Sequence, residues 1–400
     1  MRRFIRRGVT VPLIDMKTPA RLFARQLYDG LADQLQPDRM IEIANGQITL
    51  IRPATAQDAR DPALPEFDLV APGFIDLQIN GAADTQFNFD PSPEAVGRIA
   101  AGARQGGTAY ILPTFITAPG RDYTRAIAAV QAAIAQGVPG ILGVHLEGPF
   151  LSHARPGIHD PTAIRCVDDH DLDLLTTAQA GVLLLTVAPE NLPAGALLRL
   201  KAAGVRVFAG HTAASADQIA QAEAEGLVGV THLFNAMSQM TGREPGVVGA
   251  TLASRALFAG IIADGHHVDW RNVATAARLM PDRLCLVTDA MLTLAGQQTG
   301  FELHGEKIAL CDGRLTNKDG RLAGAHVSMI DSLRNMLDHT DIGLPAALRL
   351  ATVNPARALG LEQEVGTLRQ GARATFTCLT QENSVAAVMS EGRFIDPDRG

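Results

Sequence analysis

Residues 205–234 read VRVFAGHTAASADQIAQAEAEGLVGVTHLF. The first seven residues form a short apolar run. Residues 215–226 then have helical spacing, with Ser215 as a plausible N-cap and Gly226 as a C-terminal stop. A second apolar run follows over 228–234. Near-continuous apolar strands joined by a helix indicate parallel strands that are buried on both faces.

The same alternation extends from about residue 70 to residue 350. The strand-like runs are GFIDLQ (73–78), TAYILPT (108–114), ILGVHLE (141–147), VLLLTVA (182–188), VRVFAGH (205–211), VGVTHLF (228–234), FAGIIAD (258–264) and LCLVTDA (284–290). Ala-rich segments such as 94–106 and 122–137 suit helices between them. Eight strand–helix units predict an α/β fold, a (β/α)8 TIM barrel. A doubly wound open sheet is the alternative.

The two flanks of this region have a different pattern. Residues 39–52 predict a hairpin that turns at Asn45-Gly46. Short strands with intervening turns recur near the C-terminus and also in an insert after the eighth strand; these segments are 364–379, 385–395 and 302–323. We expect both flanks to form one small β-sandwich domain. The expected division is an N-terminal extension of unknown role (1–21), the small β domain (22–71 plus 352–400) and the catalytic barrel (72–351).

Composition excludes several classes of protein. The 400 residues are 46% hydrophobic and 19% charged, which is enough to bury a large core. The net charge of −7 argues against general binding to nucleic acid. The chain has no run of 18 apolar residues, so we expect no membrane span.

Cysteine use and the N-terminal residues bear on the compartment. The four cysteines are scattered without CxxC pairing; they are Cys166, Cys285, Cys311 and Cys378. This distribution favours a reducing compartment and predicts a cytoplasmic protein. Four arginines lie within the first seven residues, but Asp15 and Lys17 interrupt the stretch where a secretory signal needs an apolar segment.

Four polar residues stand at the carboxyl ends of predicted barrel strands, where such barrels place their active sites. They are Glu147, His211, His232 and Asp289. One carboxylate and two imidazoles suit Zn²⁺ and leave a position for water. A carboxylate beside them can take and return a proton. A single histidine that ends an apolar strand is more often a hydrogen-bonded core residue, but four such residues on compatible strands favour a metal site.

Six stretches carry a specific resemblance. They are PGFIDLQING (72–81), HLEGPF (145–150), GHTAAS (210–215), THLFNAMSQMTGREPG (231–246), ADGHHVD (263–269) and LVTDA (286–290). In this order they resemble the N-acetylglucosamine-6-phosphate deacetylase family of the metal-dependent amidohydrolase superfamily. Two of the motifs are specific to this family, namely HLEGP and the pair THLFNAM and GREPG. The motifs GFID and VTDA occur more widely in the superfamily.

The resemblance implies a role for each matched residue. Glu147, His211 and His232 would hold the metal, and Asp289 would be the general base and acid. His159, in PGIHDP, matches the histidine that polarises the acetamide carbonyl. Without the resemblance, a histidine in such a loop is more often a solvated residue.

The resemblance also implies a site for the sugar phosphate. Arg243 and His267 match its side-chain ligands, and the backbone at Asn235 and Ala236 completes it. The family completes this pocket across a dimer interface, so a homodimer is implied. Two alternatives stay open: Arg243 could pair with the neighbouring Glu244, and His266 could point inward in place of its neighbour.

The chain departs from the superfamily pattern after the first strand. Many amidohydrolases carry His-x-His there, whereas this chain has Gln78 and Asn80. Neutral amides are poor ligands for a transition metal, so we predict one divalent metal per subunit, with Gln78 orienting the water or the substrate. Zn²⁺ is the chemical default, and Fe²⁺ or Co²⁺ fits the same ligands. Three further residues are expected to line the sugar pocket: Met291, Ala325 and His326.

Together these features predict hydrolysis of the acetamide of N-acetyl-D-glucosamine 6-phosphate. The expected partner is this small phosphorylated amino sugar, with no nucleic acid and no membrane. The first alternative is the galactosamine epimer as substrate. The second is a cyclic-amide hydrolase, against which Gln78 and Asn80 argue because such enzymes usually carry His-x-His. The third is a catalytically dead barrel kept as a binding module.

Overall fold

The computed structural model of this protein describes residues 4–6, 9–11 and 20–395. Eight parallel strands form its central sheet, in the spatial order of the sequence. They are β7 (Phe74–Ile79), β10 (Thr108–Ile116), β11 (Gly143–Glu147), β12 (Val182–Val187), β13 (Arg206–Ala209), β14 (Gly229–Val230), β15 (Phe258–Ile262) and β16 (Leu284–Val287). Sequential order of parallel strands is that of a barrel and not of a doubly wound sheet, so the predicted (β/α)8 class is confirmed.

The first and last strands close the barrel at their carboxyl ends. Ile79 and Ala290 form a parallel bridge there. The Asp289 N–H donates to the Gln78 carbonyl at 2.9 Å, and the Asn80 N–H donates to the Ala290 carbonyl at 2.8 Å. The residues that flank this seam are therefore fixed relative to one another.

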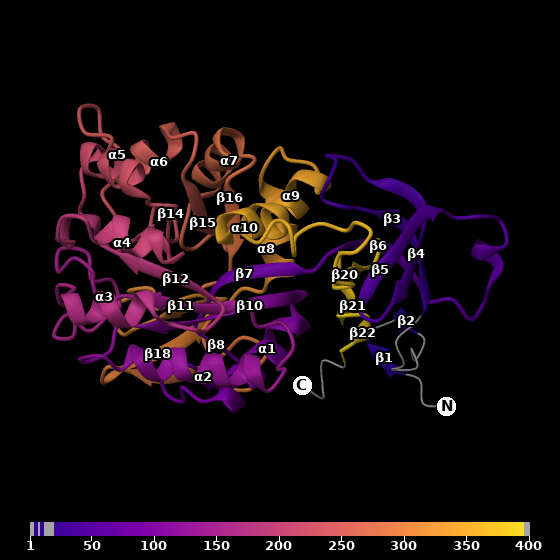
Figure 1. The fold of residues 1–400 in the computed structure, drawn as a ribbon, viewed down its shortest axis with the longest axis horizontal. Coiled ribbons are helices and arrows are strands. Elements are labelled where there is room, and N and C mark those ends of the chain that lie inside the picture. The colour runs from indigo at the N-terminus through magenta and orange to yellow at the C-terminus, as the bar shows by residue number, and fades with distance from the viewer. Residues whose placement is uncertain (1–3, 7–8, 12–19, 396–400) are drawn as a thin grey trace.

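Helices follow the strands and cover the outside of the barrel (Figure 1). They are α1 (Pro93–Gln105), α2 (Tyr123–Ala135), α3 (Asp169–Thr176), α4 (Ala196–Ala202), α5 (Ala216–Glu225), α6 (Gly246–Ala253), α7 (Trp270–Leu279), α8 (Met329–His339), α9 (Leu344–Ala351) and α10 (Val353–Leu359). The start of α5 follows the sequence prediction, because Ser215 caps it and accepts a hydrogen bond from the Gln218 N–H. Among the described residues, no helix is long and apolar enough to cross a membrane.

A seven-stranded sheet beside the barrel joins the two ends of the chain, as the indigo and yellow strands of Figure 1 show. Its order is β22 (Arg393–Phe394), β21 (Val385–Ser390), β20 (Phe376–Leu379), β6 (Glu66–Pro72), β3 (Arg21–Leu27), β4 (Gln36–Ala44) and β5 (Gln47–Pro53). The predicted turn is confirmed: Asn45 and Gly46 have positive φ of 52° and 75° and connect β4 to β5. A separate sheet built from both flanks fits the expected β-sandwich domain.

The predicted insert after the eighth strand is a three-stranded antiparallel sheet. It consists of β17 (Gly300–Leu303), β18 (Glu306–Cys311) and β19 (Arg314–Thr316). Its apolar side chains pack with Ile116 at the end of β10 and with Met291 after β16. The insert therefore lies over the mouth of the barrel.

Six short elements complete the description. β8 (Gly81–Ala82) pairs with β9 (Thr85–Gln86), and η1 (Asp58–Arg60) and η2 (Pro189–Asn191) are 3-10 turns. In the predicted N-terminal extension, β1 (Phe4–Arg6) pairs with β2 (Val9–Val11). Arg2, Arg3 and Arg7 lie outside the described residues.

Candidate active site

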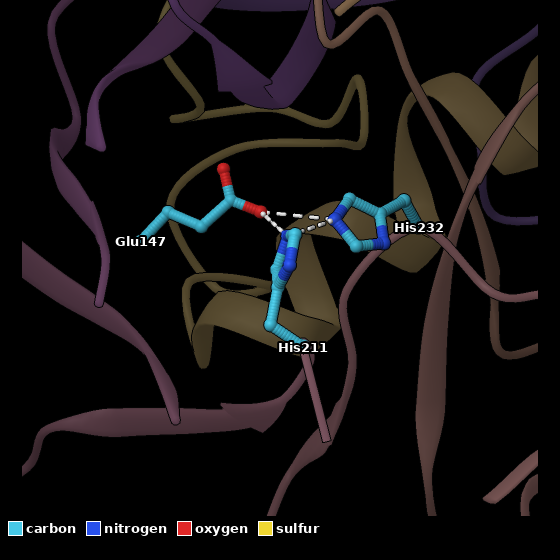
Figure 2. A group of neighbouring side chains, drawn as sticks. All are labelled: Glu147, His211 and His232. Carbon is cyan, nitrogen blue, oxygen red and sulfur yellow. Dashed lines mark hydrogen bonds and ion pairs between the residues drawn. The ribbon is translucent and has the colours of Figure 1, made fainter. Parts of the chain in front are cut away.

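Glu147, His211 and His232 come together at the carboxyl end of the barrel and point toward one another (Figure 2). The Glu147 Oε1 atom lies 3.2 Å from His211 Nε2 and 2.9 Å from His232 Nε2. The two Nε2 atoms are 3.1 Å apart. All three side chains are buried, so three possible ligand atoms surround one small volume.

The orientation of this triad fits a divalent metal. The His211 Nδ1 atom lies 3.0 Å from the Arg155 carbonyl, and a carbonyl can only accept. His211 therefore carries its proton on Nδ1 and presents the lone pair of Nε2, as a metal ligand must. Burial works to raise the pKa of Glu147, but the close approach of His211 and His232 outweighs burial and holds the pKa well below its usual range.

Three of the candidate site residues have positive φ. The angle is 47° at His211, 31° at His232 and 48° at Asp289. Side chains other than glycine rarely adopt this conformation, and it concentrates at functional sites. This geometry also explains why β13 and β14 are shorter than the sequence predicts: the chain leaves the sheet just before each histidine.

Asp289 lies beside the triad and is held by two amides. Its Oδ1 atom accepts from Asn80 Nδ2 at 2.7 Å and from Gln78 Nε2 at 3.0 Å. Gln78 Nε2 also donates to Glu147 Oε2 at 3.2 Å, so one amide group is hydrogen-bonded to both carboxylates. Burial and the charge of Glu147 raise the pKa of Asp289 to about 6. A carboxylate with this pKa can exchange a proton near neutral pH.

His159 is buried in the site and is not a solvated loop residue. Its ring lies 4.2 Å from that of His211 between centroids, and its Nδ1 atom is 2.8 Å from Thr117 Oγ1. Its Nε2 atom lies 4.0 Å from Glu147 Oε2. Burial, followed by the neighbouring His211, lowers the pKa of His159 well below its usual range. The ring is therefore neutral at physiological pH.

A pocket with a cavity volume of about 350 Å³ opens above these residues. Met291 lines it as expected, whereas Ala325 and His326 are not among its lining residues. Asn80 lines it, whereas Gln78, which was expected to orient the water or the substrate, is not among its lining residues. Arg321, for which no sequence motif predicted a role, also lines the pocket, from the loop after β19.

The expected phosphate ligands divide into two groups. Asn235, Ala236 and His267 line the pocket. The neighbouring His266 is exposed, and the His267 Nδ1 atom is 2.7 Å from Asp264 Oδ2. His267 is thus the member of the pair that points inward.

Arg243 is exposed and lies outside the pocket of this chain. Its expected alternative partner is engaged elsewhere, because Glu244 Oε1 accepts from the Ala216 N–H at 2.9 Å and the Gly246 N–H at 2.8 Å. Among the residues that the structure describes, Arg243 forms no ion pair. Its guanidinium is available to a group outside this chain.

A closed (β/α)8 barrel with such a triad and a neighbouring carboxylate defines a metal-dependent hydrolase. Comparison with known proteins specifies the family. The sequence model of the amidohydrolase family matches residues 69–395. The chain belongs to this family.

Three proteins that are similar to this chain are named as deacetylases. An N-acetylgalactosamine-6-phosphate deacetylase from Shewanella sp. (strain ANA-3) is 37% identical, over 81% of this chain and 82% of that protein. An N-acetylglucosamine-6-phosphate deacetylase from Haemophilus influenzae is 32% identical, over 92% of this chain and 96% of that protein. The crystal structure of an N-acetylglucosamine-6-phosphate deacetylase from Pasteurella multocida superposes with a TM-score of 0.88 at 30% identity, over 94% of this chain and 99% of that chain.

Proposed function

We propose that this protein hydrolyses the acetamide of N-acetyl-D-glucosamine 6-phosphate to D-glucosamine 6-phosphate and acetate. The observation that carries the proposal is the convergence of Glu147, His211 and His232 beside Asp289 in one pocket. The two named deacetylases that align over most of this chain support the substrate class. When bound to the triad, one divalent metal, with Zn²⁺ as the chemical default, lowers the pKa of water and polarises a carbonyl.

The residues around the triad supply proton transfer and orientation. Asp289 removes the proton of the attacking water, and Gln78 and Asn80 hold its carboxylate in place through the hydrogen bonds at Oδ1. When the tetrahedral intermediate collapses, Asp289 returns the proton to the departing amine nitrogen. The Thr117 hydroxyl lies 2.8 Å from His159 Nδ1 and fixes the orientation of the ring, and we assign the opposite ring nitrogen, Nε2, to a hydrogen bond with the developing oxyanion.

The phosphate end of the substrate is bound in the same pocket. We assign His267 and the backbone at Asn235 and Ala236 to this end, because they line the same pocket. Arg243 of the partner subunit completes the site in a homodimer, which accounts for the exposure of Arg243 and for its lack of an ion pair with the described residues. Remote binding of the phosphate orients the amide for attack.

All four cysteines are free, which supports a cytoplasmic location.

The galactosamine epimer is the second candidate substrate. The observation that favours it is the 37% identity to the Shewanella deacetylase named for that epimer. The two sugars differ only at the 4-hydroxyl, so the acetamide chemistry proposed for Asp289 and His159 serves both.

Acetate release from a panel of sugars tests the proposal. Metal-loaded enzyme is given the 6-phosphates of N-acetylglucosamine and N-acetylgalactosamine, and unphosphorylated N-acetylglucosamine. We expect turnover of the glucosamine phosphate and weak turnover without phosphate. A preference for the galacto epimer would mean that the same mechanism acts on that substrate. No turnover of any compound would contradict the proposal.

The Arg243→Gln substitution is expected to raise KM for the phosphorylated substrate about tenfold or more, because a charge-assisted hydrogen bond contributes about 1.5–3 kcal/mol. KM for the unphosphorylated sugar should not change. Arg255→Gln is the matched control, since Arg255 is also exposed and lies outside the pocket. Equal effects on both substrates would remove Arg243 from the phosphate site.

The pH dependence of kcat/KM should show an acid limb set by Asp289. Its pKa is raised to about 6 by burial and by Glu147, and the general base must be deprotonated. Activity should therefore fall with unit slope as pH drops through about 6, or somewhat lower with a bound cation. Asn80→Ala removes a hydrogen bond that lowers this pKa, so its acid limb should move to higher pH. A profile that is flat down to pH 4 would contradict the assignment.

A further inference from the structure

A chain of four buried side chains crosses the barrel interior on the amino-terminal side of the metal ligands. The Thr114 Oγ1 atom lies 3.0 Å from His145 Nδ1, and His145 Nε2 lies 2.8 Å from Thr186 Oγ1. The Thr186 and Thr231 hydroxyls are 2.6 Å apart. Each of the four residues is at most 3% exposed. We call this set the His145 network.

The His145 network reaches the backbone next to each metal ligand. His145 precedes Glu147 by two positions on β11, so both side chains point into the barrel. Thr231 directly precedes His232 in the chain.

The third contact involves Gly210, which directly precedes His211. A Cβ atom on Gly210 would lie 2.7 Å from Thr186 Cγ2 and 2.9 Å from Thr231 Cβ. These threonines therefore pack directly against the backbone that presents His211. Since His211 and His232 have positive φ, their backbone conformations need such support from their surroundings.

The chemistry of His145 suits a fixed bridge. His145 is fully buried and lies between two hydroxyls, those of Thr114 and Thr186. A neutral imidazole donates with one nitrogen and accepts with the other, which matches a hydroxyl on either side. Buried hydrogen bonds of this kind are costly to break, because the remaining partner is left unsatisfied.

We propose that His145 is a positioning residue that fixes the three metal ligands through Thr186 and Thr231. In this way it sets the affinity of the site for a divalent cation and the geometry of the cation's coordination. It contacts neither the cation nor the substrate. The inference rests on the metal site of the proposed function. The competing interpretation is that the His145 network contributes only to the stability of the barrel.

Binding of Co²⁺ to the metal-free full-length chain distinguishes the two interpretations. In Thr186→Val the side chain keeps its shape and loses its hydroxyl. We expect Co²⁺ affinity to fall about tenfold or more, as for the loss of other groups that orient metal ligands, and the visible d–d spectrum to shift. Thr251→Val in α6 is the matched control: Thr251 is buried, and its hydroxyl has no hydrogen-bond partner among the described residues. It should bind Co²⁺ as the unaltered chain does.

Two substitutions of His145 provide a second comparison should Thr186→Val fail to fold. Gln can donate to one hydroxyl and accept from the other, so His145→Gln should retain more of the affinity and of the spectrum than His145→Leu. A Thr186→Val or His145→Leu protein with unchanged Co²⁺ affinity and spectrum would overturn the inference, whatever its melting temperature. The readout does not require acetate release, so failure of the deacetylase assay alone leaves this test decisive.

Discussion

Replacement of Asp289 by Asn is expected to lower kcat by about 10³-fold, about 4 kcal/mol in activation free energy. Asn has nearly the same size and can still accept one hydrogen bond from Gln78 or Asn80, so the site should keep its shape. It cannot take the proton of water or return it to the amine. Metal content and substrate affinity should therefore stay close to those of the unaltered enzyme, while single-turnover acetate release falls.

The matched control for this substitution is Asp84→Asn. The Asp84 carboxylate also accepts hydrogen bonds from neighbouring N–H groups, those of Gln297 and Gln298, but it lies outside the pocket. Asp84→Asn should leave kcat unchanged. If Asp289→Asn keeps more than about one tenth of kcat, another group must be the base.

Replacement of Glu147 by Gln is expected to remove both metal and activity. Glu147 is the one carboxylate of the triad, and its Oε1 atom lies close to both histidine Nε2 atoms. The loss of partners that merely orient a ligand costs about 10–100-fold in metal affinity, so the loss of a charged ligand should exceed 100-fold. Metal analysis of the purified variant after dialysis measures this directly.

His159→Gln separates metal binding from catalysis. His159 lies next to the triad but its Nε2 atom is 4.0 Å from Glu147 Oε2, and we assign it to the oxyanion and not to the metal. This variant should keep its metal and lose about 10²-fold or more in kcat. Metal retention by Glu147→Gln would contradict the assignment of Glu147 as a metal ligand. Metal loss by His159→Gln would contradict the assignment of His159 to the oxyanion.

The barrel could be predicted because buried parallel strands leave a strong pattern in sequence. Near-continuous apolar runs and the cap at Ser215 both follow from local chemistry, and both are present in the structure. The strand ends were less predictable. His232 belongs to an apolar run, yet β14 ends at Val230 because the chain turns there with positive φ.

The candidate site was predictable where polar residues end apolar strands. Glu147, His211, His232 and Asp289 satisfy this condition, and the structure brings them together. His159 lies in a loop without such a pattern, and only its resemblance to a family motif indicated it.

Contacts between segments far apart in sequence were not predictable. Gln78 bridges Glu147 and Asp289 through one amide, a geometry that depends on closure of the barrel. Arg321 enters the pocket from an insert whose path over the barrel no local pattern determines. The three threonines of the His145 network come from three different strand regions, and a buried threonine carries no sequence signal of its own.

Titration of metal-free enzyme with Zn²⁺, followed by acetate release from N-acetylglucosamine 6-phosphate, tests the central claim most directly. With Glu147, His211 and His232 as the ligands, and with Gln78 and Asn80 in place of a second ligand pair, the rate should rise linearly and reach its plateau at about one equivalent per chain. A plateau at two equivalents would contradict the single-metal site and favour the two-metal chemistry of the cyclic-amide hydrolases. A rate independent of Zn²⁺ would contradict the metal-dependent mechanism itself.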